Sequence, residues 1–125
     1  TLRADFTIAG GGAAMARLLM GNAPTAVFVA SDTMAMGALS ELQRRGIGVP
    51  GDVSLAGFDD VPGLEFVHPR LTTVHVPMAE LGAAGVERLM RHLDGHGTNA
   101  DTKLHPVELV IRESTGRPRA ARAAV

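Results

Sequence analysis

The sequence has no cysteine, no tryptophan and no tyrosine, and almost no net charge. Without cysteine, disulfide bonds, thiol catalysis and cysteine-based zinc sites are excluded. A formal net charge of −1 gives no electrostatic indication that these 125 residues bind nucleic acid. No apolar run approaches the roughly 18 residues of a membrane helix, and no signal-peptide pattern opens the chain. A content of 46% hydrophobic and 20% charged residues is typical of a globular domain with a core.

Motifs of catalysis and metal binding are missing as well. The five histidines show no metal-ligand spacing, and no motif assembles a catalytic serine, histidine and acid. Asp59 and Asp60 could form an acid–base pair, but adjacent residues at a strand end point apart. The glycine run 10–12 lacks the rest of a phosphate-binding loop and is better explained as the entry to a helix. We therefore expect no enzyme activity, no metal and no cofactor.

Helix and strand patterns alternate along the chain. Apolar residues at helical spacing predict three helices, over residues 12–20, 32–45 and 78–93. Short apolar or β-branched runs predict four strands, over residues 26–30, 53–58, 71–74 and 107–111. The uninterrupted run 26–30 is typical of a parallel strand buried on both faces. Together these patterns predict an α/β fold with a doubly wound parallel sheet.

Polar side chains follow two of the predicted strands. Ser31 and Asp32 come after strand 26–30, and Asp59 and Asp60 come after strand 53–58. In an open parallel sheet, ligands bind beyond the carboxyl ends of the strands, and carboxylate and hydroxyl groups there suit a ligand rich in hydroxyl donors. Two alternatives remain open from the residues alone: Asp32 caps its helix, and the two aspartates serve only a turn.

The basic residues near the end of the chain are interpreted differently. They lie in a stretch rich in glycine, proline and alanine and are Arg112, Arg117, Arg119 and Arg122. Such a composition is typical of a solvated, frayed tail.

Four motifs follow one another along the chain. The first is a strand ending in Ser31-Asp32 with the helix start MAMGAL, and the second is GIGVPGDVSLAGFDD over residues 46–60. The third is PRLTTV over residues 69–74, and the fourth is LVIREST over residues 109–115. In this order and spacing they resemble the signatures of the lactose-repressor/galactose-repressor family of bacterial transcription regulators, over roughly residues 5–118.

The resemblance implies a fold, a partner and a place in a longer protein. Residues 1–118 would form an incomplete C-terminal lobe of a two-lobed periplasmic-binding-protein-like fold, for effector binding and dimerisation. Residues 77–102 would pack with an absent N-terminal lobe, and residues 119–125 would be a flexible tail. Because the chain begins at Thr1 rather than Met, we expect a fragment. The full-length protein would be a cytoplasmic homodimer that binds operator DNA through an N-terminal helix-turn-helix absent from this chain.

The resemblance also assigns residues. Effector contacts would come from Ser31, Asp32 and Asp59; Ser31 stands where the family often has asparagine, so the effector, expected to be a sugar, is not specified further. The dimer surface would include Met34, Met36 and Phe66, with core packing as the alternative.

Two further points follow from the resemblance. With four phenylalanines as the only aromatic residues, any aromatic wall for a sugar would come mainly from the absent half. The apolar stripe of helix 78–93 would need cover from its own sheet or a second copy of the chain. Two other functional classes share the scaffold, a periplasmic sugar-binding protein of a transporter and an enzyme, and the motifs favour the repressor over both.

Overall fold

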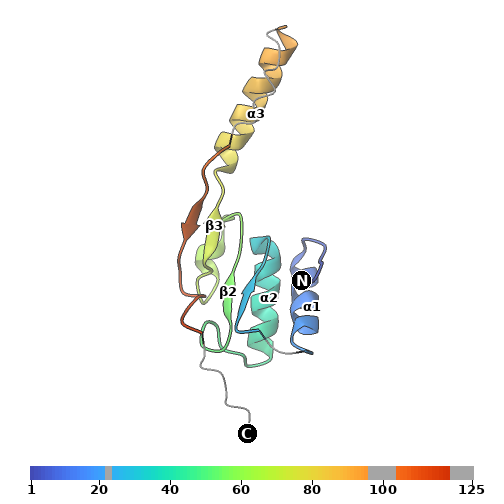
Figure 1. Cartoon of the computed structure of the whole chain (residues 1–125), viewed down its shortest axis with the longest axis vertical. Coiled ribbons are helices and arrows are strands. Elements are labelled where there is room, and N and C mark those ends of the chain that lie inside the picture. Colours follow the sequence, from blue (N-terminus) through green and yellow to red (C-terminus); the bar gives the residue numbers. More distant parts are fainter. Residues whose placement is uncertain (22–23, 96–103, 119–125) are drawn as a thin grey trace. The chain divides into compact units, whose positions relative to one another are not determined.

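The computed structural model describes residues 1–21, 24–95 and 104–118, so the expected tail 119–125 lies outside the described residues. The chain divides into two compact units, one of residues 1–75 with those described from 109 onward, and one of residues 76–108. The elements in chain order are α1 (Ile8–Leu18), β1 (Ala26–Phe28), α2 (Asp32–Arg44), β2 (Ser54–Ala56), the 3-10 helix η1 (Leu64–Phe66), β3 (Thr73–His75), α3 (Met78–Leu93) and β4 (Glu108–Val110) (Figure 1).

β1 and β2 pair in parallel, as predicted, but the regular pairing is short. β1 pairs with β2 in a register that sets Val27 opposite Leu55. Beyond β2 the parallel pairing continues only as two isolated bridges, Ala56 with Thr72 and Asp59 with His75, and β3 pairs with β4. The Thr72 amide donates to the Ser114 hydroxyl (2.8 Å) instead of to a strand carbonyl, which is one reason why strand 71–74 is observed as Thr73–His75.

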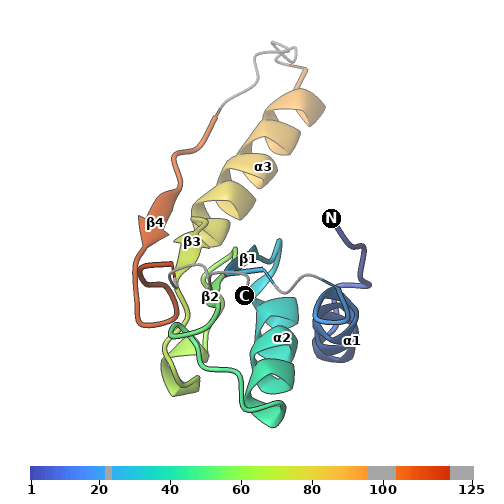
Figure 2. The ribbon, with the colours of Figure 1, turned by 60° about the horizontal axis from the view of Figure 1, so that its bottom comes forward.

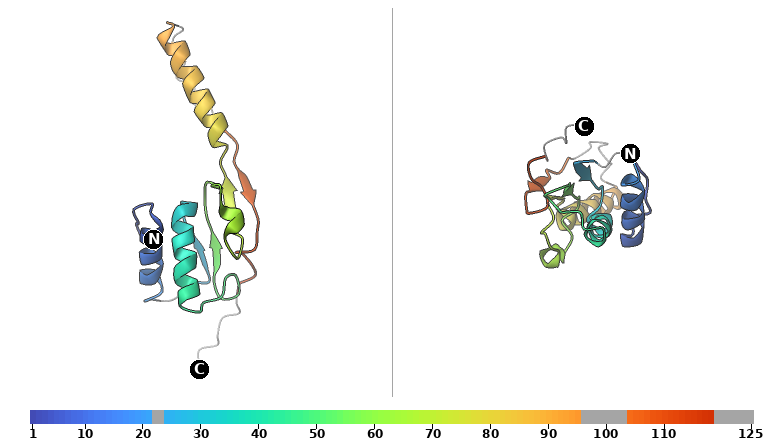
Figure 3. Two further views of the ribbon diagram at one scale, coloured as in Figure 1. Left: turned by 180° about the vertical axis from the view of Figure 1, so that it is seen from behind. Right: turned by 90° about the horizontal axis from the view of Figure 1, so that it is seen from below.

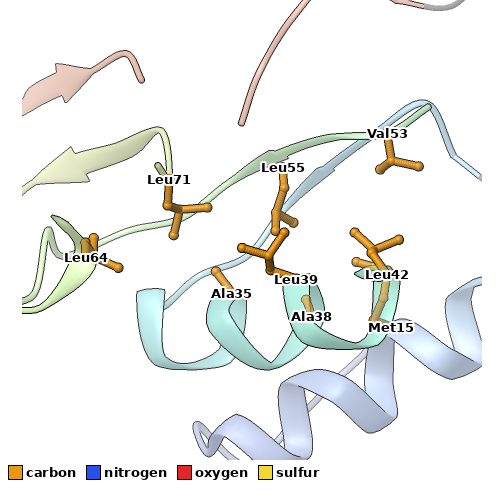
Figure 4. Close-up of a cluster of buried hydrophobic side chains, with 9 residues drawn as sticks. All are labelled: Met15, Ala35, Ala38, Leu39, Leu42, Val53, Leu55, Leu64 and Leu71. Carbon is orange, nitrogen blue, oxygen red and sulfur yellow. The ribbon is translucent and has the colours of Figure 1, made fainter. Parts of the chain in front are cut away.

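The core of this unit lies between the strands and α2. Its buried members are Met15, Ala35, Ala38, Leu39, Leu42, Val53, Leu55, Leu64 and Leu71 (Figure 4). Leu39 and Leu42 project from α2 toward the strands, as the helical spacing predicts, and Met15 reaches the same cluster from α1. α1 and α2 lie side by side (Figure 3).

The first helix begins earlier than predicted. It starts at Ile8 rather than residue 12, after Thr7, whose hydroxyl accepts the Gly10 amide (2.9 Å), and it ends at Leu18. The glycine run is therefore inside α1, not before it. A Cβ at Gly11 would lie 2.1 Å from the Met34 carbonyl oxygen, and one at Gly37 would lie 1.8 Å from that of Ile8. Close helix packing, not helix propensity, explains these glycines.

α2 ends as the sequence predicts. Gly46 has φ 68°, its amide donates to the Gln43 carbonyl (2.9 Å), and the Ile47 amide donates to the Leu42 carbonyl (3.0 Å). This is the glycine C-cap pattern that satisfies the last carbonyls of a helix. In the last turn, Arg44 and Arg45 both donate to Glu41, and these hydrogen bonds lower the pKa of Glu41 to about 2.

Burial of strand 26–30 on both faces was wrong. Phe28 is 63% exposed, and its ring meets Phe58 edge-on at a centroid distance of 6.5 Å. One face of β1 packs toward α2, where Val27 and Val29 are half-buried against the core. The other face is not covered by the described chain, so the apolar run alone could not indicate how many layers the sheet has.

The second unit contains α3, which occupies the predicted range of residues as one continuous helix (Figure 2). None of its residues is buried. The large apolar side chains of the predicted stripe are all exposed: Met78, Leu81, Val86, Leu89, Met90 and Leu93. Among the described residues, no helix combines the length and apolarity needed to span a membrane.

Candidate functional site

Parallel pairing brings the predicted site residues to one end of the sheet. Ser31 and Asp32 follow β1 at the start of α2, and Asp59 and Asp60 follow β2. The Asp32 amide donates to the Phe58 carbonyl (2.8 Å), which joins the two strand ends directly. The carboxyl ends of β1 and β2 therefore form a single polar edge, where α/β proteins bind ligands.

Asp32 is buried, and both of its carboxylate oxygens accept hydrogen bonds from within the protein. Its Oδ1 accepts the Thr73 hydroxyl (2.7 Å) and its Oδ2 accepts the Val61 amide (3.2 Å). A Cβ at residue 57 would lie 2.0 Å from Oδ1, so glycine is needed there to admit the carboxylate. The capping alternative was wrong, because Ser31 occupies the N-cap position and Asp32 belongs to the first helical turn. Asp32 ties α2 to the segments that follow β2.

Ser31 is buried, and its hydroxyl does not cap the helix. Its backbone is extended, and the carbonyl accepts the Ala35 amide (2.9 Å), the first bond of the helix. The side chain makes no capping hydrogen bond. The Ser31 hydroxyl therefore does not make the hydrogen bond to a backbone amide that an N-cap side chain usually makes.

Asp59 has an unusual backbone conformation and a carboxylate to which no described group donates a hydrogen bond. Its φ is 108°, in the region that favours glycine, and its amide donates to the Val74 carbonyl (3.0 Å). Within the described ranges, no side chain or amide donates to the Asp59 carboxylate. Burial and the negative charge of Asp32 raise the pKa of Asp59. A strained residue with a half-buried carboxylate that no protein group binds is typical of a binding site.

Asp60, by contrast, is held by two side chains. Arg112 Nη2 donates to its Oδ1 (2.6 Å), and His75 Nδ1 lies 3.1 Å from its Oδ2. The interpretation of Arg112 as part of a frayed tail was wrong, because its side chain is 23% exposed and also donates to the Leu71 carbonyl (3.0 Å). Arg112 lies inside the fourth motif and His75 follows the third, but neither motif indicates that the two side chains meet at Asp60.

The hydroxyl residues of the third and fourth motifs join strands. Ser114 is buried; its Oγ donates to the Leu55 carbonyl (2.6 Å) and accepts the Thr72 amide (2.8 Å). The Thr72 hydroxyl accepts the Arg112 amide (2.9 Å) and lies 3.0 Å from that of Thr115. These hydroxyl groups therefore satisfy backbone groups that join neighbouring strands.

The three residues predicted for a dimer surface differ in exposure. Met34 is 7% exposed and lies against α1, and Met36 is half-buried against the core. Phe66 is 87% exposed on η1. Phe66 therefore has the free surface that a partner would need, and the dimer role of all three stays a prediction.

The polar edge does not coincide with an apolar cavity or with a group of metal-binding side chains among the described residues. An apolar cavity of about 400 Å³ lies between α1, β1 and α2, and its lining includes Leu18, Val27, Phe28 and Met34 but not Ser31 or Asp59. No group of three or more acidic or histidine side chains in the described part of the chain could hold a metal ion.

Comparison with known proteins gives consistent matches over almost the whole chain. Residues 2–115 match the model of the periplasmic binding protein-like domain. The HTH-type transcriptional repressor CytR of Escherichia coli K12 is 42% identical over 114 residues, which are 90% of this chain and 33% of CytR. The probable HTH-type transcriptional repressor ExuR of Bacillus subtilis is 35% identical over 118 residues, 94% of this chain and 35% of ExuR.

Among solved structures, a LacI family transcriptional regulator from Enterococcus faecium, with bound ribose, superimposes with a TM-score of 0.84 at 31% identity. The superposition covers 95% of this chain and 44% of that regulator. The chain thus spans about a third of the length of the curated relatives it matches.

Proposed function

The chain belongs to the family of periplasmic binding protein-like domains found in LacI-family regulators, and on that premise we propose that it is the effector-binding part of a DNA-binding transcriptional repressor. The single observation that carries the proposal is the Asp59 carboxylate, half-buried and without a donor from the described residues, at the carboxyl end of β2. Because its relatives are repressors, a regulator is favoured over a transporter's periplasmic binding protein.

The proposed effector is a sugar. A carboxylate can accept two or more hydroxyl donors, and the Ser31 hydroxyl can both donate and accept, which suits a ligand rich in hydroxyl groups. The Enterococcus faecium regulator contains bound ribose, which supports this ligand class. In this proposal Ser31 and Asp59 contact the effector. Asp32, whose two oxygens accept internal donors, contributes by holding the two strand ends together.

Regulation would proceed by a shift between conformations of a dimer in the cytoplasm. An effector that binds one arrangement of the full-length protein more tightly than another changes the population of the arrangement that binds operator DNA. The base and phosphate contacts would come from a helix-turn-helix outside this chain, consistent with the HTH-type relatives and with the net charge of −1 here.

The proposal is tested by replacing Asp59 in the full-length protein. Calorimetric titration with a panel of pentoses and hexoses, beginning with ribose, identifies the sugar that the wild type binds. Asp59→Ala should then weaken binding by about 1–3 kcal/mol, because a charge-assisted hydrogen bond is lost.

The matched control is Asp94→Ala, which removes an exposed carboxylate at the end of α3 and should leave the affinity unchanged. Equal affinity of the wild type and Asp59→Ala would reject the site. Failure of every sugar to bind the wild type would reject the ligand class.

A further inference from the structure

The carboxylate next to the proposed ligand contact is held from two separate segments of chain. Arg112 Nη2 donates to Asp60 Oδ1 (2.6 Å), and Arg112 Nη1 donates to the Leu71 carbonyl (3.0 Å), so the guanidinium is fixed at two points. His75 Nδ1, in β3, lies 3.1 Å from Asp60 Oδ2. Both oxygens of Asp60 therefore have partners within the protein, which leaves Asp60 poorly suited to contact a ligand itself.

Asp60 belongs to a turn that needs such support. Asp59 has φ 108° and Asp60 has φ 58°, so two consecutive non-glycine residues lie in the left-handed region. Conformations of this kind cost of order 1–3 kcal/mol each and persist only where the surroundings enforce them. The turn is held by the two partners of the Asp60 carboxylate, by the bond of the Asp59 amide to the Val74 carbonyl (3.0 Å), and by the bond of the Val61 amide to Asp32 Oδ2 (3.2 Å).

We infer that Arg112 is a positioning residue for effector binding, which acts through Asp60 and is assisted by His75. The Asp59 carboxylate makes no bond to the described protein, so its direction is set by the backbone of the turn. The ion pair between Arg112 and Asp60 is one of the contacts that hold this backbone, and it is the one that joins the turn to the fourth motif. The inference rests on the proposed function, because Asp59 is there the residue that contacts the effector.

The test is a double-mutant cycle in the full-length protein, with the sugar that the wild type binds as the probe. Arg112→Met should weaken binding by about tenfold, whereas in the Asp59→Ala background the same change should matter less than about twofold. Arg112→Lys should recover part of the loss, because lysine keeps the charge but not the two-point donor geometry. A merely structural role would lower the affinity equally in both backgrounds.

The matched control is Arg70→Met. Arg70 also pairs with a carboxylate distant in the sequence, Glu113 (2.9 Å), but both side chains of this pair are exposed. We expect its affinity to stay within about twofold of the wild type. Unchanged affinity in Arg112→Met, or an equal loss in Arg70→Met, would overturn the inference.

A second measurement decides the inference even if the sugar proposal fails. Amide hydrogen exchange in Arg112→Met should show protection at Asp59 reduced by at least about tenfold, while Leu55, whose amide donates to the Ser114 carbonyl (2.8 Å), stays protected. An unaffected Asp59 amide, or equal losses at both amides, would reject positioning whether or not any sugar binds.

Discussion

Asp59 destabilises the folded protein in two ways, through its backbone and through its carboxylate. Its backbone lies at φ 108°, and burial together with the charge of Asp32 raises the pKa of its carboxyl group. A raised pKa means that the ionised form is less favourable in the folded state than in the unfolded state. Asp59 therefore lowers the stability of the protein at neutral pH, a cost that the proposed role in binding would explain.

Asp59→Asn should make the protein more stable at neutral pH. Asparagine carries no charge and tolerates the left-handed region well. The cost of ionised Asp59 is present in full above its folded pKa, and it disappears as the pH falls below the unfolded value of 3.8. Urea unfolding between pH 3 and pH 8 should thus show a stability difference that shrinks toward acid.

A stability difference that stayed constant with pH would assign the effect to the backbone alone. The same variant should bind the effector more weakly than the wild type, so stability and affinity should move in opposite directions.

At the scale of elements, the contact between α1 and α2 depends on glycine. A Cβ at Gly37 would lie 1.8 Å from the Ile8 carbonyl oxygen and 2.9 Å from the Gly12 amide nitrogen. Both neighbours are backbone atoms, so relief would require the helices to move apart. In an isolated helix the same glycines would only reduce stability.

Gly37→Ala should therefore lower the free energy of unfolding by about 1–3 kcal/mol, as overpacking of a core does. The control is Gly82→Ala in α3, where the new methyl group meets no atom within 4 Å. That change should raise helix stability by about 0.5–1 kcal/mol. Circular dichroism during urea unfolding measures both, and a Gly37→Ala variant as stable as the wild type would contradict the packing explanation.

At the scale of the whole molecule, α3 presents an apolar face with no buried residue. Its exposed side chains include Val86 and Leu89, on the same face as Met90 and Leu93. Exposed apolar surface of this extent favours association in water. The expectation that its own sheet or a second copy of the chain covers this stripe stays a prediction.

The purified 125-residue chain should self-associate at micromolar concentrations, and a variant with both Val86→Glu and Leu89→Glu should do so less. Sedimentation velocity at several concentrations measures the effect. Glu80→Lys, which changes charge away from the stripe, is the control. A wild-type chain that stays monomeric at every concentration would show that this face does not drive association.

The sequence by itself determined the elements whose signals are local. The period of apolar residues set the bounds of α3, and Gly46 set the end of α2, because spacing and caps act within a few residues. Alternation of strands and helices predicted parallel pairing and hence the edge where Ser31 and Asp59 lie. The four motifs, which are also local, are sufficient to indicate the family.

Only the tertiary structure decided which groups are partners. The bonds of Asp32 to Thr73, of Asp60 to Arg112 and of Ser114 to Leu55 join residues 41, 52 and 59 positions apart. No local pattern encodes such pairs, because they depend on how the strands are brought together. The exposure of Phe28 and the position of the α1 glycines inside a helix were likewise decided by what packs against them. Propensity and periodicity act along the chain, whereas burial and hydrogen bonding act across it.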